Sequence, residues 1–211
     1  MNCGLPTPGP AEPFTVTPED VGVWYHVYNS FGRPDTRADT FSEGWGDTRF
    51  APIKQSDGTP VHMYYMGSTA ECAYMESILH DVVLAPRLFE VDRLRYFHLV
   101  QLELHSPLQC VSFHTPYLPQ VQRMTRARLI DSLPACYPET RAWAQAAFLQ
   151  CADAQAIAYG SRRNDAGRCL MLFHQRITHP PFRILKEEPL AIDPRRAEVQ
   201  ALVRRLKLNE I

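Results

Sequence analysis

Eighteen prolines are spread through the 211 residues of the chain, and they constrain its fold more than any other sequence feature. Proline fixes its own φ angle and has no N–H to donate, so it interrupts helix interiors and central strands. We therefore expect short elements joined by frequent loops rather than long helices. Hydrophobic residues make up 45% of the chain, which is enough for a packed core, and the length fits one large domain.

The hydrophobic pattern predicts strands and helices that are interspersed without a regular βαβ alternation, and this order favours an α+β fold. The expected strands are residues 21–28, 61–66, 96–104, 110–113, 156–159 and 169–174. The expected helices are residues 68–83, 117–131, 138–153 and 193–207. Residues 1–20 are rich in proline and are expected to form a flexible arm or an extended strip, with residues 21–211 forming a single domain.

The cysteines and the charge balance bear on the environment of the protein. None of the six cysteines lies in a C-x-x-C pair, so a zinc ribbon is not expected. The first twenty residues lack the pattern of a secretory signal, and no apolar run reaches transmembrane length. We therefore expect a cytoplasmic protein with reduced thiols. The net charge of −1 indicates neither a nucleic-acid nor a membrane partner.

Residues 29–60 form a long irregular segment with Gly, Pro, Asp, Ser and Thr throughout. A loop of this length inside a compact domain is usually functional or disordered. Trp45, Arg49 and Phe50 lie within it, and such side chains are costly to leave idle in solvent. A functional loop is therefore the better interpretation.

Two helices carry start signals. Ser68 and Glu71 form an S-x-x-E capping box, which predicts a helix from Ser68 to about residue 83, with a proline soon after. The last helix is expected to begin with Asp193 as its cap and Pro194 in its first turn.

One acidic residue of the helix that begins at Ser68 lies on its apolar side. At 100° per residue, one stripe holds Cys72, Met75, Leu79 and Val83. Glu76 falls within this stripe, and a carboxylate that faces a core is costly unless it is paired or used. Helical geometry leaves two readings open, which are a functional carboxylate and a structural glutamate tied to an arginine.

Three segments, taken together and in this order, resemble the RES domain, a bacterial family named for its Arg, Glu and Ser. They are GWGDTRFAP at residues 44–52, YMGSTAECAYME at residues 65–76 and IAYGSRRNDAGRCLMLF at residues 157–173. Each motif is weak alone, and the ordered set is moderately specific. On this resemblance, Arg49, Tyr65, Glu76 and Ser161 match the family's functional positions.

The chain departs from the family pattern in its first expected strand, where many members have an arginine and this chain has His26. RES proteins are similar in fold to ADP-ribosyltransferase toxins, which implies a compact mixed or antiparallel β core flanked by helices. One class of those toxins places a first-strand His, a Tyr and a Glu around NAD+, and His26, Tyr65 and Glu76 match that trio. Arg33 or Arg37 in the following loop can replace the missing arginine contact.

The resemblance implies an enzyme that degrades NAD+ by hydrolysis or phosphorolysis, acting as a toxin with a cognate antitoxin partner. Cleavage of the nicotinamide–ribose bond passes through an oxocarbenium-like state, which Glu76 is expected to stabilise. Tyr65 is expected to stack on the nicotinamide and Arg49 to bind the pyrophosphate. Ser161 and His26 are expected to hydrogen-bond ribose or amide groups. NAD+ is the substrate, and no metal is expected, because nicotinamide is a good leaving group.

Two other functions stay open at this point. The protein can be an ADP-ribosyltransferase that modifies a protein target, for which residues 29–60 would supply a binding loop. It can also be a catalytically degenerate RES fold that binds a nucleotide or a partner protein, with His26 as the mark of lost activity. Release of nicotinamide from NAD+ separates the two enzymes from the degenerate fold, and labelled protein in place of free ADP-ribose separates the transferase from the NAD+-degrading enzyme.

Overall fold

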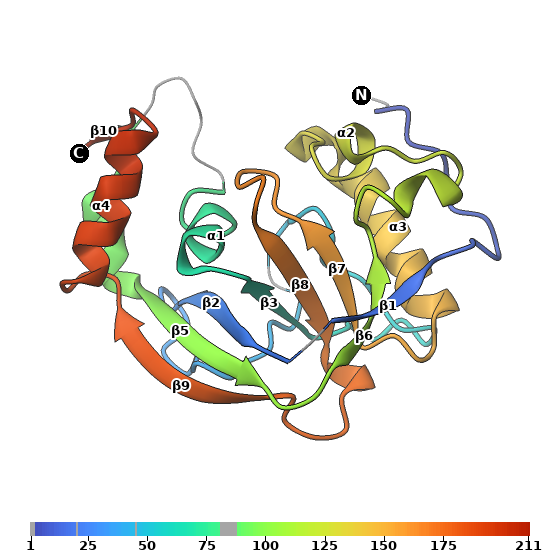
Figure 1. Cartoon of the computed structure of the whole chain (residues 1–211), viewed down its shortest axis with the longest axis horizontal. Helices are drawn as coiled ribbons and strands as arrows, with labels where there is room; N and C mark the ends of the chain where they lie inside the picture. Colours follow the sequence, from blue (N-terminus) through green and yellow to red (C-terminus); the bar gives the residue numbers. More distant parts are fainter. Residues whose placement is uncertain (1–2, 20, 45, 81–87) are drawn as a thin grey trace.

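The computed structural model describes residues 3–19, 21–44, 46–80 and 88–211. A strongly curved eight-stranded sheet forms the body of the molecule, in the order β1-β6-β7-β8-β3-β2-β5-β9 (Figure 1). Its strands are β1 Val16–Glu19, β2 Val23–Asn29, β3 Met63–Gly67, β5 Phe97–Leu104, β6 Leu108–Ser112, β7 Ala156–Gly160, β8 Arg168–Phe173 and β9 Phe182–Pro189. Neighbouring strands are antiparallel, except for the parallel pair of β6 and β7. The sheet is thus mixed, and the α+β prediction is confirmed.

The helices are short, as the prolines predict. They are α1 Ala70–Met75, α2 Arg126–Leu129, α3 Tyr137–Gln150 and α4 Arg195–Arg205, with 3₁₀ turns η1 Val91–Tyr96, η2 Leu118–Gln120, η3 Pro134–Cys136 and η4 His174–Arg176. Two short strands, β4 Leu88–Phe89 and β10 Asn209–Glu210, pair beside α4. Figure 1 shows α1 and α4 toward one end of the sheet and α2 and α3 toward the other.

Side chains alternate between the two faces of the strands, and each face builds its own core. Helix α3 packs Trp143 and Phe148 into a cluster with Met171 and Phe173 of β8. On the opposite face, the hydrophobic cluster is formed largely by side chains that project from the strands, among them Trp24, Tyr64, Leu170 and Leu172. Helices α1 and α4 share a third cluster, which includes Met75, Leu99 and Val203. The sheet is therefore supported by separate groups of helices at its two ends.

The helix that was expected from Ser68 is shorter and is capped differently. Thr69 is the N-cap, because its hydroxyl accepts from the N–H of Cys72, and the helix ends at Met75. The Ser68 hydroxyl instead accepts from the N–H of Arg168 and ties the turn to β8. Residues 76–80 form turns, and the expected helical residues 81–83 lie outside the described part of the chain. The capping-box prediction was thus wrong by one residue.

Two further helix predictions needed correction. The segment 117–131 contains only η2 and α2, because Gln122 and Arg123 between them adopt φ angles of 49° and 53°, outside any right-handed helix. Helix α4 has its predicted apolar face, but Pro194 occupies the N-cap and no side chain caps the helix. Asp193 therefore lies one residue too early to act as the expected cap.

The N-terminal residues lie along α3 as an extended strip and then enter the sheet as β1. The carboxylate of Glu139 accepts from the N–H groups of Cys3 and Leu5, and Trp143 Nε1 donates to the Pro6 carbonyl. Cys3 and Cys136 form a disulfide, with their Cα atoms 5.6 Å apart. The expectation of reduced thiols is therefore wrong for this pair, because the strip brings Cys3 against the start of α3. Among the described residues, Cys72, Cys110, Cys151 and Cys169 are free.

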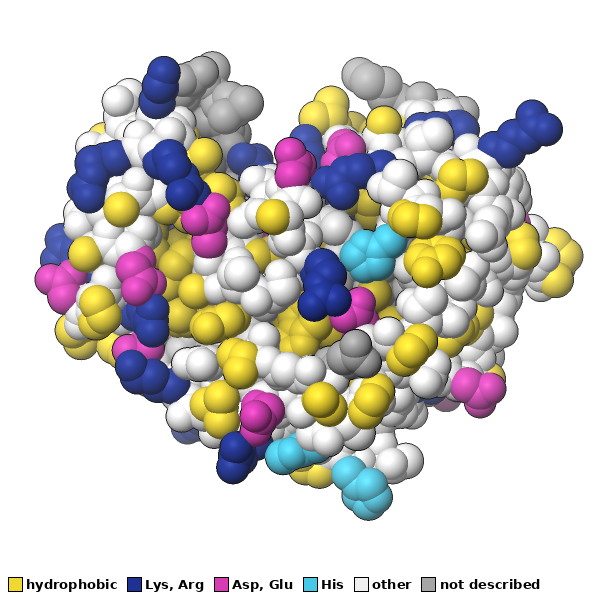
Figure 2. All heavy atoms as spheres, viewed as in Figure 1, with side chains coloured by type: hydrophobic (Ala, Val, Ile, Leu, Met, Phe, Trp, Pro, Cys, Tyr) yellow, Lys and Arg dark blue, Asp and Glu magenta, His cyan; other side chains and the backbone are white. Residues whose placement is uncertain are grey.

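Two general features concern the surface charge and the length of the helices. Figure 2 shows Lys and Arg side chains interspersed with Asp and Glu over the visible face, rather than gathered into a basic patch. In the part of the chain that the structure describes, no helix is long and apolar enough to cross a bilayer.

Candidate active site

A cavity of about 340 Å³ opens where β2 and β3 diverge. The two strands pair at Tyr25 and Gly67, and no further residue pair continues their ladder. The cavity is lined from β2, β3, β7, the turn after α1 and the loop of residues 29–60, so that loop has the functional position expected of it. Four of the five predicted site residues line it, namely His26, Arg49, Tyr65 and Glu76.

Glu76 is the C-terminal cap of α1, and its backbone N–H donates to the Cys72 carbonyl. Its Oε1 atom accepts two hydrogen bonds, from Ser161 Oγ at 2.6 Å and from the N–H of Arg162 at 3.0 Å. No ion pair joins Glu76 to an arginine within the described ranges, so the reading of a glutamate tied to an arginine does not apply. One carboxylate oxygen is thus fixed by two neutral donors at the cavity wall.

Ser161 lies behind Glu76 and is fully buried. Its hydroxyl oxygen accepts from the N–H groups of Arg163 and Asn164, at 3.1 and 3.0 Å, and its single proton is donated to Glu76. Arg126 holds the Ser161 carbonyl at 2.6 Å. Since Ser161 does not line the cavity, its position favours orienting Glu76 over the expected direct contact with the substrate.

His26 bridges the gap between the diverging strands. Its Nδ1 atom lies 2.7 Å from the Tyr65 carbonyl oxygen, and a carbonyl only accepts, so Nδ1 carries the proton. Burial lowers the pKa of His26 to about 4, against the weaker opposing effect of this hydrogen bond. The ring is therefore neutral at pH 7, and Nε2 is a hydrogen-bond acceptor. The Tyr64 ring packs against the imidazole at a centroid distance of 4.1 Å, with the two planes tilted by 30°.

Tyr65 projects from β3 into the cavity, and its hydroxyl lies 3.1 Å from Thr48 Oγ1. Burial raises the pKa of Tyr65 to about 12, so the phenol stays protonated at neutral pH. Arg49 and Glu76 both act electrostatically on this hydroxyl, with opposite sign.

Arg49 is only 3% exposed, yet its Nε and Nη2 atoms have no hydrogen-bond partner among the described residues. The guanidinium instead lies 5.9 Å from the Phe50 ring centroid and 5.8 Å from that of Tyr137. A buried cation with unused donors is costly without a ligand, and it suits an anionic group inside the cavity. Of the two arginines considered as substitutes in the loop, Arg33 lines the cavity and Arg37 does not.

Several lining residues were not found from the sequence. Thr36 and Thr48 come from the irregular loop, and the Thr36 hydroxyl is buried without a described partner. Tyr159 contributes its ring from β7, and burial raises its pKa well above the usual range. Hydroxyl-rich composition in the loop was the only available signal for the threonines, and Tyr159 read as an ordinary buried strand residue.

The sequence and the fold of the chain both resemble known proteins. The model of the RES domain family matches residues 23–193. The structure is similar to a solved chain described as "Crystal structure of the M.tuberculosis MbcT-MbcA toxin-antitoxin complex", with a TM-score of 0.63. That alignment covers 90% of this chain and 92% of the other, at 15% sequence identity, and therefore concerns the fold alone. No curated protein matches the sequence.

Proposed function

The chain belongs to the RES domain family, and on that premise we propose that it is a cytoplasmic enzyme that degrades NAD+ by cleaving the nicotinamide–ribose bond. The observation that carries the proposal is the pair of Glu76 and Ser161, in which a buried hydroxyl orients a charged carboxylate at the wall of a cavity. The unpartnered guanidinium of Arg49 near the same cavity supports an anionic substrate.

Glu76 would act on the transition state of the cleavage. As the bond to nicotinamide lengthens, positive charge develops on the ribose ring, as in glycoside cleavage. A carboxylate that is already oriented stabilises this charge without reorganisation, which is often the largest catalytic contribution of an active site. The two donors on Oε1 leave Oε2 available for the ribose, where it can accept from the 2′-hydroxyl.

The other side chains would bind and orient the dinucleotide. We assign Arg49 to a phosphate of the pyrophosphate, because its planar fork matches phosphate oxygens. Tyr65 would stack on the cationic nicotinamide ring. The neutral His26 would accept from a ribose hydroxyl or from the carboxamide N–H₂. No step in this scheme requires a metal, because nicotinamide leaves as a neutral molecule.

We propose that depletion of NAD+ makes the protein a toxin and that a cognate antitoxin restrains it. The solved chain of similar fold comes from a toxin–antitoxin complex, which supports such a partner here. Water or phosphate is the acceptor of the ADP-ribosyl group in this proposal. Labelling of a protein from radioactive NAD+ would instead favour the transferase.

Replacement of Glu76 by Gln tests the proposal, because the amide oxygen can still accept from Ser161 and Arg162 while the negative charge is lost. We expect nicotinamide release to fall by at least roughly 10²-fold, with the melting temperature little changed. Glu71→Gln is the matched control on α1, since Glu71 pairs with Arg205 outside the cavity. Equal turnover in a folded Glu76→Gln protein would remove Glu76 from the mechanism.

A further inference from the structure

No hydrogen bond from Nε or Nη2 holds the Arg49 guanidinium in its orientation, since neither atom has a partner among the described residues. Two aromatic rings flank it instead, Phe50 from the same loop and Tyr137 from α3. Tyr137 is 2% exposed and is the first residue of that helix. One of the two rings beside the cation is therefore supplied by a packed helix outside the loop.

The start of α3 also holds the backbone that carries Arg49. Thr140 donates from its hydroxyl to the Arg49 carbonyl. Arg141 pairs with Asp47 and donates to the Thr48 carbonyl at 3.3 Å. Residues 47–49 are thus attached to the first turns of α3 at three successive positions.

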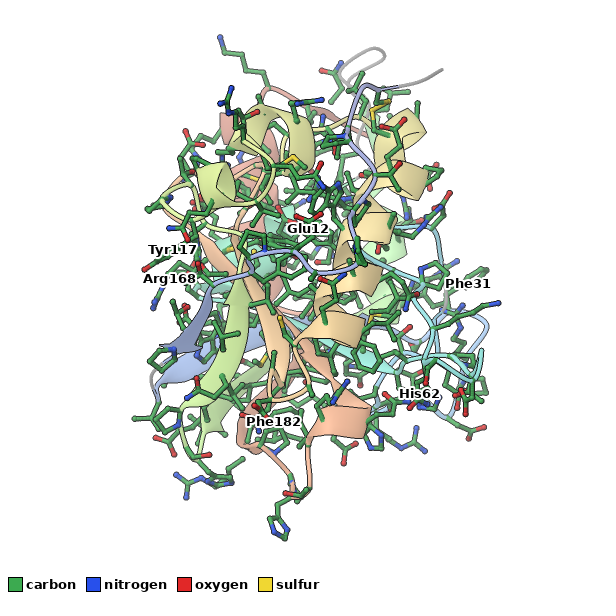
Figure 3. All side chains as sticks on the ribbon, turned by 90° about the vertical axis from the view of Figure 1, so that its right-hand side faces the viewer. Glu12, Phe31, His62, Tyr117, Arg168 and Phe182 are labelled. Carbon is green, nitrogen blue, oxygen red and sulfur yellow. A yellow bond between two sulfur atoms is a disulfide. The ribbon has the colours of Figure 1, made fainter. Side chains whose placement is uncertain are left out.

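Tyr137 is itself fixed from two sides. Its hydroxyl lies 3.4 Å from His80 Nε2, and His80 lines the cavity. Its neighbour Cys136 is joined to Cys3, and Figure 3 shows the N-terminal strip passing over α3, with Glu12 beside the helix. The Tyr137 ring therefore has little freedom to move away from the cation.

We propose that Tyr137 is the positioning residue for Arg49, holding its guanidinium so that the free donors meet the anionic part of the substrate. The aromatic face attracts the cation, and that attraction is strongest where water is excluded. This inference rests on the proposed function, in which Arg49 binds a phosphate of NAD+. It adds a residue that lies outside the three motif segments, at the start of α3.

The test separates binding from catalysis in purified full-length protein with NAD+ as substrate. Tyr137→Phe keeps the aromatic face and should keep KM within about twofold of wild type. Tyr137→Leu removes that face and should raise KM about three- to thirtyfold, with kcat within about twofold, because Arg49 contributes similar binding in the ground and transition states. If the leucine variant does not fold, Tyr137→Met offers the same test with a more adaptable side chain.

A double-mutant cycle assigns the effect to Arg49. In an Arg49→Ala background, the further change of Tyr137→Leu should leave KM within about twofold, since no cation remains to be positioned. Phe148→Leu is the matched control, because Phe148 also lies on α3 beneath an arginine, Arg176, at 4.6 Å, outside the cavity. That variant should lower the melting temperature and leave KM unchanged.

An unchanged KM in folded Tyr137→Leu, or the same KM increase with and without Arg49, would overturn the positioning role while leaving the NAD+ activity intact. A wild-type protein that releases no nicotinamide overturns the proposed function and this inference together. The two failures are therefore distinguishable in one set of measurements.

Discussion

His26 supplies a side-chain hydrogen bond between β2 and β3 at the place where their backbone pairing ends. The backbone pairing of β2 with β3 stops after Tyr25 and Gly67, which leaves the Tyr65 carbonyl without a strand partner. The imidazole N–H of His26 supplies that hydrogen bond, and the strands are free to diverge around the cavity. An arginine at this position would carry a permanent charge, whereas the partly buried histidine presents a neutral acceptor.

The lowered pKa of His26 makes folding depend on pH. The unfolded histidine binds a proton near pH 6.5 and the folded one near 4, so the unfolded state holds more protons between these values. This contribution to stability is present above pH 6.5 and is lost as pH falls toward 4. From pH 7 to pH 5 it costs about 2 kcal/mol of unfolding free energy.

The variant His26→Asn checks this prediction by urea unfolding at the two pH values. Its amide N–H can still donate to the Tyr65 carbonyl, but it has no group that titrates in this range. The wild-type protein should therefore lose about 2 kcal/mol more than the variant between pH 7 and pH 5. Burial and nearby arginines also lower the pKa of His114. The unfolding free energy of both proteins therefore changes with pH by this same additional amount. Identical losses in both would show that His26 titrates normally.

At the level of single residues, the motifs indicated candidate site residues but not how these residues contact one another. Glu76 and Ser161 are 85 positions apart and share a 2.6 Å hydrogen bond, whereas the resemblance had implied a contact from Ser161 to the substrate. The burial of Ser161, and its two backbone donors, depend on how the loop after β7 folds against α1. Spacing in a sequence carries no information about such contacts, so the orienting role became visible only in the structure.

At the level of elements, apolar spacing predicted burial better than it predicted helix ends. Cys72, Met75 and Leu79 are all buried, although α1 ends at Met75, because the turn that follows keeps Leu79 directed inward. Strand β9 was missed because most of its residues are exposed, as befits an edge strand that pairs only with β5. Edge strands are often polar, so they lack the alternation that identifies internal strands.

The N-terminal strip is an element whose attachment can be tested directly. The Cys3–Cys136 disulfide closes a sequence separation of 133 residues, which in the chain-entropy model stabilises the fold by up to about 5 kcal/mol. Reduction by dithiothreitol, or Cys3→Ser, should lower the urea midpoint of wild-type protein. Cys151→Ser, at a free and partly exposed cysteine, should not. An unchanged urea midpoint after reduction would mean that the strip contributes no stability through this bond.

At the level of the whole molecule, the fold class and the membership of the RES family were predictable, whereas the strand order was not. The parallel contact between β6 and β7 spans α2 and α3, and it depends on packing between distant segments rather than on any local pattern. The same long-range packing creates the cavity from β2, β3, β7, the turn after α1 and the 29–60 loop. The motifs thus indicate most of the candidate site residues, and the strand order brings those residues together around one cavity.

Cleavage of NAD+ by this protein is measured as the release of nicotinamide from NAD+ incubated with the purified wild-type chain. With the adenosine half labelled, chromatography in the presence and absence of phosphate identifies the second product. We predict free nicotinamide in equal amount to a soluble ADP-ribosyl product, either ADP-ribose or its phosphate ester. Intact NAD+ after prolonged incubation with folded protein would contradict the account, and label retained on protein would point to the transferase.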